Sequence, residues 1–242
     1  DLKPEQSYNA NINFLKKLYS DNGTYLSFEA AAWFTYFTNQ ITPDYDSDPN
    51  KIIYKNLNGH AITTGLSANA DLVLTNGLKF ILGATYMNVE KTEDGITTDQ
   101  ILTEKFSGTW SISYKIRPWN LEIDYTGNVY GKMRLPLLGP LDPRKEYSNP
   151  FSIQNIQFTF DKFKNFEIYG GVKNILDWTP NKGNPFIIAR ANDPFDKDVQ
   201  YNNDGSVIAT TGNPYALTFD PNYVYGPNQG IRSFLGLRYT LQ

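Results

Sequence analysis

Apolar and polar residues alternate with a period of two along most of the chain. In the segment 102–116 the even positions carry mainly apolar residues such as Phe106, Trp110 and Ile112, whereas the odd positions carry Thr, Ser and Lys. Successive side chains of a β-strand point to opposite faces of the sheet, so this pattern predicts strands with one apolar and one polar face. Nine segments show it, namely 6–19, 24–41, 52–75, 78–94, 99–116, 119–135, 150–162, 166–176 and 229–241.

The predicted strands are long, and the connections between them alternate in length. The segment 24–40 alternates well beyond the ~5–6 residues that are usual for a strand of a soluble protein. Two short connections contain Asn-Gly, which favours a tight hairpin turn. Membrane β-barrels have tight turns on the periplasmic side and long loops outside. The short connections are 21–23, 76–77, 117–119 and 162–165, and the long ones are 42–51, 95–98, 136–149 and 177–228.

These features predict an all-β protein, a transmembrane antiparallel β-barrel whose last strand descends toward the periplasm. The segment 177–228 is then a long external loop. Single-chain bacterial barrels normally have an even number of strands, whereas this chain supplies an odd number. An open edge would leave unpaired backbone groups in lipid, where water cannot satisfy them. We therefore expect residues 1–242 to be the C-terminal portion of a barrel whose other strands lie upstream.

Composition narrows the function classes further. The chain has 242 residues, a formal net charge of -3 and a mean hydropathy of -0.46. No stretch approaches the ~20 apolar residues of a membrane helix, which excludes a helical membrane protein. Alternating strands keep the mean hydropathy of a membrane barrel low, so a barrel remains compatible with this value. The chain has no basic run that would suit a nucleic acid, and it lacks cysteine, which excludes disulfides.

The sequence holds no signature of an enzyme or of a metal site. Neither G-x-S-x-G nor H-E-x-x-H occurs, so no catalytic activity and no cofactor are predicted. His60 is the only histidine and has no partner ligand at a useful spacing. Asp193, Asp196 and Asp198 crowd one segment near Asp177, but their spacing does not match a calcium loop. We interpret His60 as structural and these carboxylates as solvated.

Charged and aromatic residues point to two further roles. On the polar faces of the predicted strands we expect ion pairs between neighbouring strands. Arginine and aromatic side chains suit an anionic, ring-bearing ligand, although Tyr and Trp also mark membrane interfaces. The charged residues of the polar faces are Lys105, Lys115, Glu122, Asp124 and Arg238. The candidate ligand-binding residues are Arg190, Tyr215, Tyr223 and Tyr225 in the long connection, with Tyr130, Lys132 and Arg134 at the end of the sixth predicted strand.

Several short motifs resemble those of TonB-dependent outer-membrane receptors. Residues 170–177, Gly-Gly-Val-Lys-Asn-Ile-Leu-Asp, resemble the G-V-x-N-L-F-D/N strand near the end of these receptors. Residues 65–70 resemble their S-x-G-V-E-L strand, and residues 225–232 and 236–241 resemble their closing strand. The long connection resembles that of receptors of the Bacteroidetes group, through Arg190, residues 193–197 and residues 223–225.

The resemblance carries expectations for the whole protein. It implies a barrel of about 22 strands, of which this chain supplies the last nine, and an N-terminal plug domain that these residues do not include. It also implies a bacterial outer-membrane location, contact with outer-membrane lipid, energy coupling to the TonB-ExbB-ExbD system through the plug, and uptake of a scarce nutrient. That nutrient would be an iron-siderophore, haem, cobalamin or a similar compound. Two departures are Ile175-Leu176, where Leu-Phe is commoner, and Gln242, where many outer-membrane barrels end in Phe.

Three alternatives remain open at the level of sequence. A glycan-importing receptor shares the same architecture. A self-contained small outer-membrane barrel, either an adhesin or an enzyme, would have an even number of strands. A soluble β-sandwich that binds sugars would have shorter strands than those predicted here.

Overall fold

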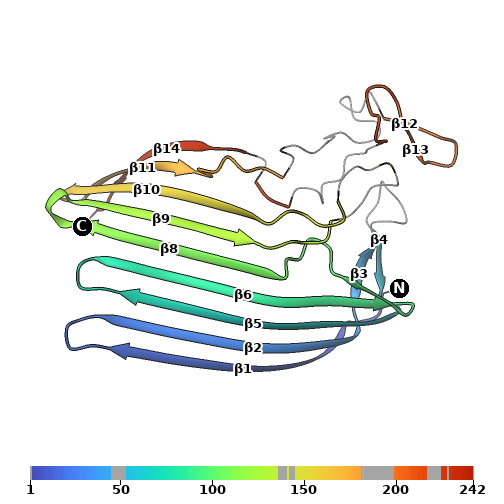
Figure 1. Cartoon of the computed structure of the whole chain (residues 1–242), viewed down its shortest axis with the longest axis horizontal. Coiled ribbons are helices and arrows are strands. Elements are labelled where there is room, and N and C mark those ends of the chain that lie inside the picture. Colours follow the sequence, from blue (N-terminus) through green and yellow to red (C-terminus); the bar gives the residue numbers. More distant parts are fainter. Residues whose placement is uncertain are drawn as a thin grey trace.

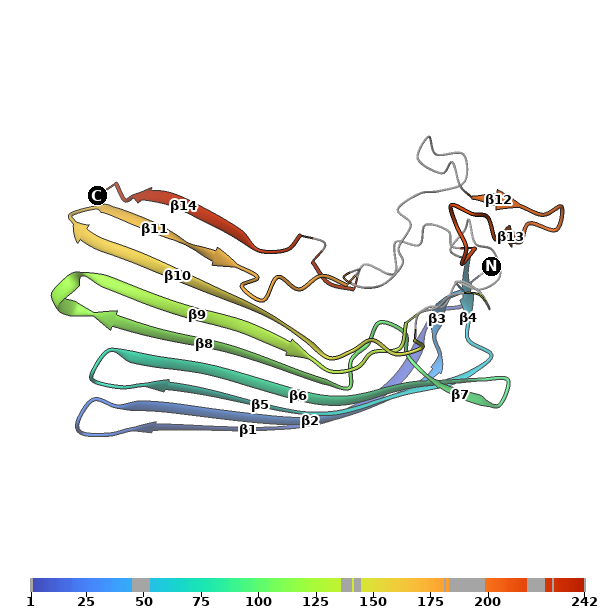
Figure 2. The ribbon, with the colours of Figure 1, turned by 45° about the horizontal axis from the view of Figure 1, so that its top comes forward.

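Nine long antiparallel strands form one curved sheet in the computed structural model (Figures 1 and 2). The structure describes residues 2–44, 53–135, 141, 145–180, 182, 199–216, 225–227 and 229–241. Within these residues the strand order is β1-β2-β5-β6-β8-β9-β10-β11-β14, and each of the nine predicted strands corresponds to one of them. Their bounds are Gln6–Tyr19 for β1, Tyr25–Asn39 for β2, Gly59–Val73 for β5, Leu78–Glu93 for β6, Phe106–Ile116 for β8, Leu121–Tyr130 for β9, Phe151–Phe163 for β10, Phe166–Lys173 for β11 and Arg232–Tyr239 for β14.

The smaller elements lie in the connections. The strands β3 and β4 form a separate hairpin, β7 pairs with the end of β6, and β12 and β13 form a hairpin within the β11–β14 connection. A single 3-10 turn, η1, joins β8 to β9. No helix in the described part of the chain has the length and hydropathy to cross a membrane. The bounds are Ile41–Asp44 for β3, Ile53–Asn56 for β4, Ile96–Asp99 for β7, Gln200–Tyr201 for β12, Val207–Ile208 for β13 and Arg117–Trp119 for η1.

The predicted alternation of short and long connections is confirmed. The β1–β2, β5–β6, β8–β9 and β10–β11 turns lie at one end of the sheet, which we call the short-turn end (Figure 1). The other connections lie at the opposite end, the long-loop end. In the first two turns Gly23 and Gly77 adopt φ of 86° and 91°, which glycine tolerates without a steric penalty. Asn22 and Asn76 accept hydrogen bonds from the amides two residues on, at 2.9 and 3.1 Å.

Two predicted strands were wrong in their continuity. The predicted strand 52–75 is divided into β4 and β5, because buried Leu57 hydrogen-bonds through its amide to the carbonyl of Gln40. The predicted strand 99–116 begins only at Phe106. Leu102 has a φ of 54°, which is a left-handed conformation and is incompatible with an extended strand. Most of the predicted loop 95–98 instead belongs to β7, Ile96–Asp99, which folds back on β6.

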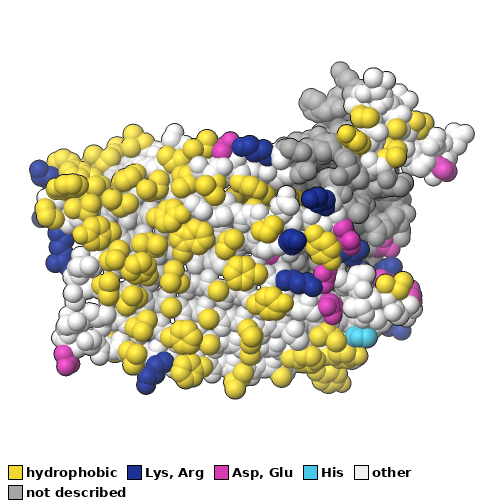
Figure 3. All heavy atoms as spheres, in the orientation of Figure 1, with side chains coloured by type: hydrophobic (Ala, Val, Ile, Leu, Met, Phe, Trp, Pro, Cys, Tyr) yellow, Lys and Arg dark blue, Asp and Glu magenta, His cyan; other side chains and the backbone are white. Residues whose placement is uncertain are grey.

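The two faces of the sheet differ as the alternation predicts. One cross-strand row of the apolar face carries small residues on four adjacent strands, and a neighbouring row of the polar face carries Glu29, Asn69 and Thr109. Figure 3 shows hydrophobic side chains spread over the strands, with charged side chains mainly at the two strand ends. The small residues of the apolar row are Ala30, Ala68, Ala84 and Gly108.

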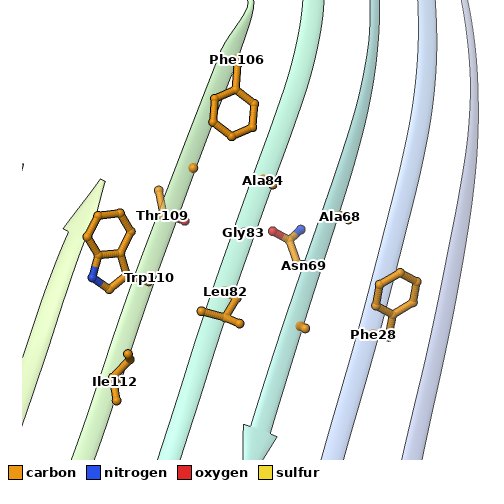
Figure 4. Close-up of a pocket in the computed structure, with 12 residues that line it drawn as sticks. Phe28, Ala68, Asn69, Leu82, Gly83, Ala84, Phe106, Thr109, Trp110 and Ile112 are labelled. Carbon is orange, nitrogen blue, oxygen red and sulfur yellow. The ribbon is translucent and has the colours of Figure 1, made fainter. Parts of the chain in front are cut away.

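Small side chains leave a shallow groove of about 590 Å³ on the apolar face. Its floor includes Ala68 and Ala84, and Phe106 and Trp110 stand beside it from β8 (Figure 4). The lining is almost entirely hydrocarbon, so water gains few hydrogen-bonding partners there. The groove is therefore part of an apolar surface that suits a hydrocarbon environment.

The described sheet is open. β1 and β14 form its two edges, and each pairs on one side only within the described residues. Every residue of β1 is exposed, including apolar ones such as Ile12 and Phe14. Unpaired edges of this length template further strand pairing.

Candidate functional site

An aromatic cluster occupies the polar face at the long-loop end. Phe151, the first residue of β10, lies opposite Tyr130, the last residue of β9, with ring centroids 4.9 Å apart. Trp178 stacks on Phe151 at 3.9 Å with an interplanar angle of 6°. Tyr225 lies 5.9 Å from Phe151 and 6.0 Å from Trp178. The cluster thus joins the ends of two strands to both ends of the β11–β14 connection.

Aliphatic side chains support these rings from below. Met133 and Leu135 follow β9 and are 4% and 6% exposed, while Phe151 itself is 5% exposed. Leu102 and Ile153 pack against the same group. Burial of this kind fixes the ring positions, because each buried apolar side chain contributes ~1.5–3 kcal/mol to the stability of the folded state.

A charged network joins three connections beside the cluster. Asp99 at the end of β7 accepts hydrogen bonds from Lys105 at 3.0 Å and from the Tyr147 hydroxyl at 2.9 Å. Arg134 pairs with Glu146 at 3.2 Å and donates to the main-chain oxygen of Asp99. Burial alone would raise the pKa of Asp99, but the hydrogen bonds from Lys105 and Tyr147 outweigh it and lower that pKa. The same contact raises the pKa of Tyr147.

Acidification is expected to loosen this network selectively. Since the folded state lowers the pKa of Asp99, its contribution to stability is complete above the unfolded value of ~3.9 and is lost as the pH falls through the folded value. We expect faster proteolysis of the segment 99–105 below about pH 4, and an Asp99→Asn variant that is already susceptible at pH 7. Tyr147→Phe keeps the ring and should show an intermediate effect. Equal susceptibility of wild type and Asp99→Asn at pH 7 would contradict this role.

The predicted ligand residues are only partly brought together. Tyr130 and Tyr225 meet through Phe151, whereas Arg134 is engaged in the charged network. Lys132 is exposed and forms no ion pair within the described residues. Tyr215 lies apart in the β11–β14 connection and is 41% exposed. Arg190 and Tyr223 lie outside the described residues, and ligand contact by any of the seven stays a prediction.

The remaining candidates have structural surroundings. His60 stacks on Tyr36 at 5.5 Å and is half-buried. Asp177 pairs with Lys182 at 2.9 Å, whereas Asp193, Asp196 and Asp198 lie outside the described residues. No cluster of carboxylates and histidines that could hold a metal is found in the described part of the chain.

The predicted ion pairs between neighbouring strands of the polar face are confirmed for Arg238, which lies on β14 and pairs with Glu167 on the adjacent strand β11 at 2.7 Å. Lys115 on β8 also forms an ion pair, but its partner Asp161 lies on β10, two strands away. The other three residues behave differently. Asp124 accepts a hydrogen bond from Ser113 at 2.5 Å, Lys105 precedes its strand, and Glu122 forms no ion pair with any described residue.

Phe151 and Trp178 are the residues that sequence reasoning missed. Both lie at element ends, and neither belongs to a motif of known chemistry. Trp178 directly follows the motif at residues 170–177, which is a signal that could have drawn attention to it.

Solved structures share this fold. The pyoverdine outer membrane receptor FpvA of Pseudomonas aeruginosa PAO1 matches with a TM-score of 0.61 and 16% identity over 99% of this chain and 30% of that chain. A ferric enterobactin receptor, PfeA, of Pseudomonas aeruginosa matches with a TM-score of 0.60 and 18% identity over 98% of this chain and 32% of that chain. The copper transporter OprC matches with a TM-score of 0.54 and 14% identity over 74% and 26%. No curated protein matches the chain.

These matches assign the sheet to part of a larger barrel wall. The chain spans less than a third of the length of each of the three solved structures. The predicted fold class, an all-β antiparallel barrel wall, is therefore confirmed. A family model described as TonB dependent receptor-like, beta-barrel, matches residues 1–175, which is most of the chain. The chain therefore belongs to the TonB-dependent receptor β-barrel family.

Proposed function

We propose that the complete protein is a bacterial outer-membrane receptor that imports a scarce metal chelate. The observation that carries the proposal is the two-faced wall of a TonB-dependent receptor barrel, with an apolar face for lipid and a polar face for a lumen. In the outer membrane the long-loop end would face the outside of the cell and the short-turn end would face the periplasm. A plug upstream of this chain would couple transport to TonB, ExbB and ExbD.

The aromatic cluster and its neighbours support a ring-bearing, anionic substrate. Two solved relatives of the same fold are described as bound to pyoverdine and in complex with enterobactin, and a third is described as the ferric-catecholate import receptor Fiu. Lys132 supplies an exposed positive charge at the same end of β9 as Tyr130. An ammonium group and aromatic rings together suit an anionic catecholate complex. An iron-siderophore is therefore the substrate class that we propose, ahead of haem, cobalamin or a glycan.

Uptake by the full-length receptor tests the proposal. We expect the receptor to restore uptake of radioactive iron, supplied as ferric enterobactin or ferric pyoverdine, to a strain that lacks its own receptors. Uptake should disappear when TonB is deleted. Copper and cobalamin serve as competing substrates, because the fold is shared with the copper transporter OprC. Uptake of copper alone, or of none of these compounds, would overturn the proposal.

A point substitution at the long-loop end refines the same test. Lys132→Gln is expected to lower the affinity for the chelate about tenfold, the size of one lost charge-assisted contact of ~1.4 kcal/mol. Lys145→Gln removes a second exposed lysine near the same end and should leave the affinity unchanged. Equal affinities of the two variants would exclude Lys132 from the binding surface.

A further inference from the structure

One asparagine, Asn174, makes hydrogen bonds to both ends of the β11–β14 connection. Asn174 follows β11 directly and is 4% exposed. Its side-chain nitrogen donates to the carbonyl of Trp178 at 2.7 Å and to that of Gln229 at 3.2 Å, and its side-chain oxygen accepts from the amide of Trp178 at 3.1 Å. Its own amide donates to the side chain of Asn155 on β10 at 3.0 Å. Asn174 therefore binds the start of the connection, the end of the connection and the sheet.

Asp177 makes a second link between the same two segments. Its Oδ1 accepts a hydrogen bond from the amide of Ile231 at 2.9 Å. A Cβ placed on Gly230 would lie 2.1 Å from that oxygen, so the carboxylate occupies the space of a side chain at residue 230. Asn174 and Asp177 both take left-handed φ angles, 52° and 51°, and the Asp177 amide donates to the Asn174 carbonyl at 2.9 Å. Asparagine and aspartate tolerate this backbone best among residues with a side chain.

Aromatic packing makes a third link. Trp178 from the start of the connection stacks on Phe151, and Tyr225 of the returning segment approaches both rings. A Cβ placed on Gly226 would lie 2.4 Å from the indole, so the backbone at residue 226 packs directly on the ring.

We propose that these contacts form a clasp, made of Asn174, Asp177 and Trp178 on one side and Tyr225, Gly226, Gln229, Gly230 and Ile231 on the other. The clasp holds both ends of the connection at one point of the wall, so that opening one end releases the other. It positions Tyr225 and Trp178 on Phe151 independently of the residues between them. All of these contacts are made within the protein, so the clasp does not depend on the identity of the substrate.

Hydrogen exchange on the purified full-length receptor tests the coupling. Asn174→Gly removes the side-chain hydrogen bonds and keeps a residue that accepts the left-handed backbone. We expect amides of both 176–180 and 229–231 to exchange about tenfold faster, which corresponds to ~1.4 kcal/mol. Asn165→Gly is the matched control, because Asn165 has a φ of 61° in the β10–β11 turn at the opposite end of β11. It should leave both segments unchanged.

A second pair of variants separates a clasp from a local turn. Asp177→Gly removes the acceptor for the Ile231 amide, whereas Asp177→Asn retains an oxygen at the same place and should restore slow exchange. The two Asp177 variants also test the clasp if Asn174→Gly prevents folding. Faster exchange confined to 176–180, with 229–231 unchanged in Asn174→Gly and Asp177→Gly, would overturn the clasp. Equally fast exchange in Asp177→Asn and Asp177→Gly would do the same.

Discussion

Arginine at position 68 is expected to block stable insertion of the barrel, whereas arginine at position 69 is expected to be tolerated. Ala68 lies in the row of small residues on the apolar face, and Asn69 is its neighbour on the polar face. A charged side chain facing the bilayer midplane costs ~2–4 kcal/mol, while one facing an aqueous lumen costs little. The two positions are adjacent on β5 and lie on opposite faces of the sheet, so a comparison of the two variants isolates the effect of lipid.

Membrane insertion of the full-length receptor provides the measurement. The fraction of folded protein can be read from its altered electrophoretic mobility without heating, after refolding into phospholipid vesicles over a denaturant series. Ala68→Leu serves as a size control, because it fills the groove without adding charge. Equal destabilisation by Ala68→Arg and Asn69→Arg would contradict the assignment of the two faces.

Valine at position 65 is expected to destabilise the wall by displacing a tryptophan. A Cβ placed on Gly65 would lie 2.1 Å from Cζ2 of Trp33, which covers this glycine from the adjacent strand β2. Overpacking of this kind costs ~1–3 kcal/mol. Ser67→Val is the matched control, because Ser67 lies two residues further on the same face opposite the small Ala31.

Thermal unfolding in detergent measures this effect. Removal of the indole should relieve the clash, so Gly65→Val with Trp33→Ala is expected to be more stable than the sum of the two single effects. A double-mutant cycle reports that coupling directly. Additive effects, or a Gly65→Val variant as stable as Ser67→Val, would show that the indole does not depend on this glycine.

The long strands and the tight turns could be predicted from the sequence because both depend on local information. Alternation defines a strand with two different faces, and Asn22-Gly23 and Asn76-Gly77 define hairpins through backbone angles that few other residues adopt. The breaks in two predicted strands could not be found in this way. Leu102 leaves the strand conformation while its amide bonds to the carbonyl of Arg134, which is distant in sequence.

The candidate site was predictable by residue type and not by arrangement. The sequence shows Tyr130 and Tyr225 as aromatic residues at predicted loop ends, and the structure places both against the same ring, Phe151. Phe151 lies in a predicted strand and Trp178 directly follows a motif. Neither signal predicts that the two rings stack, since their partners come from other strands and loops. The charge of Arg134 suggests ligand binding in the sequence, but its guanidinium pairs with Glu146, a residue that only the folded connection brings near.

Because the clasp holds the two ends of the β11–β14 connection together, the residues between them can change in length and sequence without destabilising the sheet. Loop closure entropy rises slowly with length, by ~0.6 kcal/mol for each doubling, so insertions between residues 179 and 224 cost little once the base is closed. Asn174 and Asp177 fix where β11 ends and where the chain returns to β14. Changes of length in the intervening sequence should therefore leave the strands that bear it, and their pairing, unchanged.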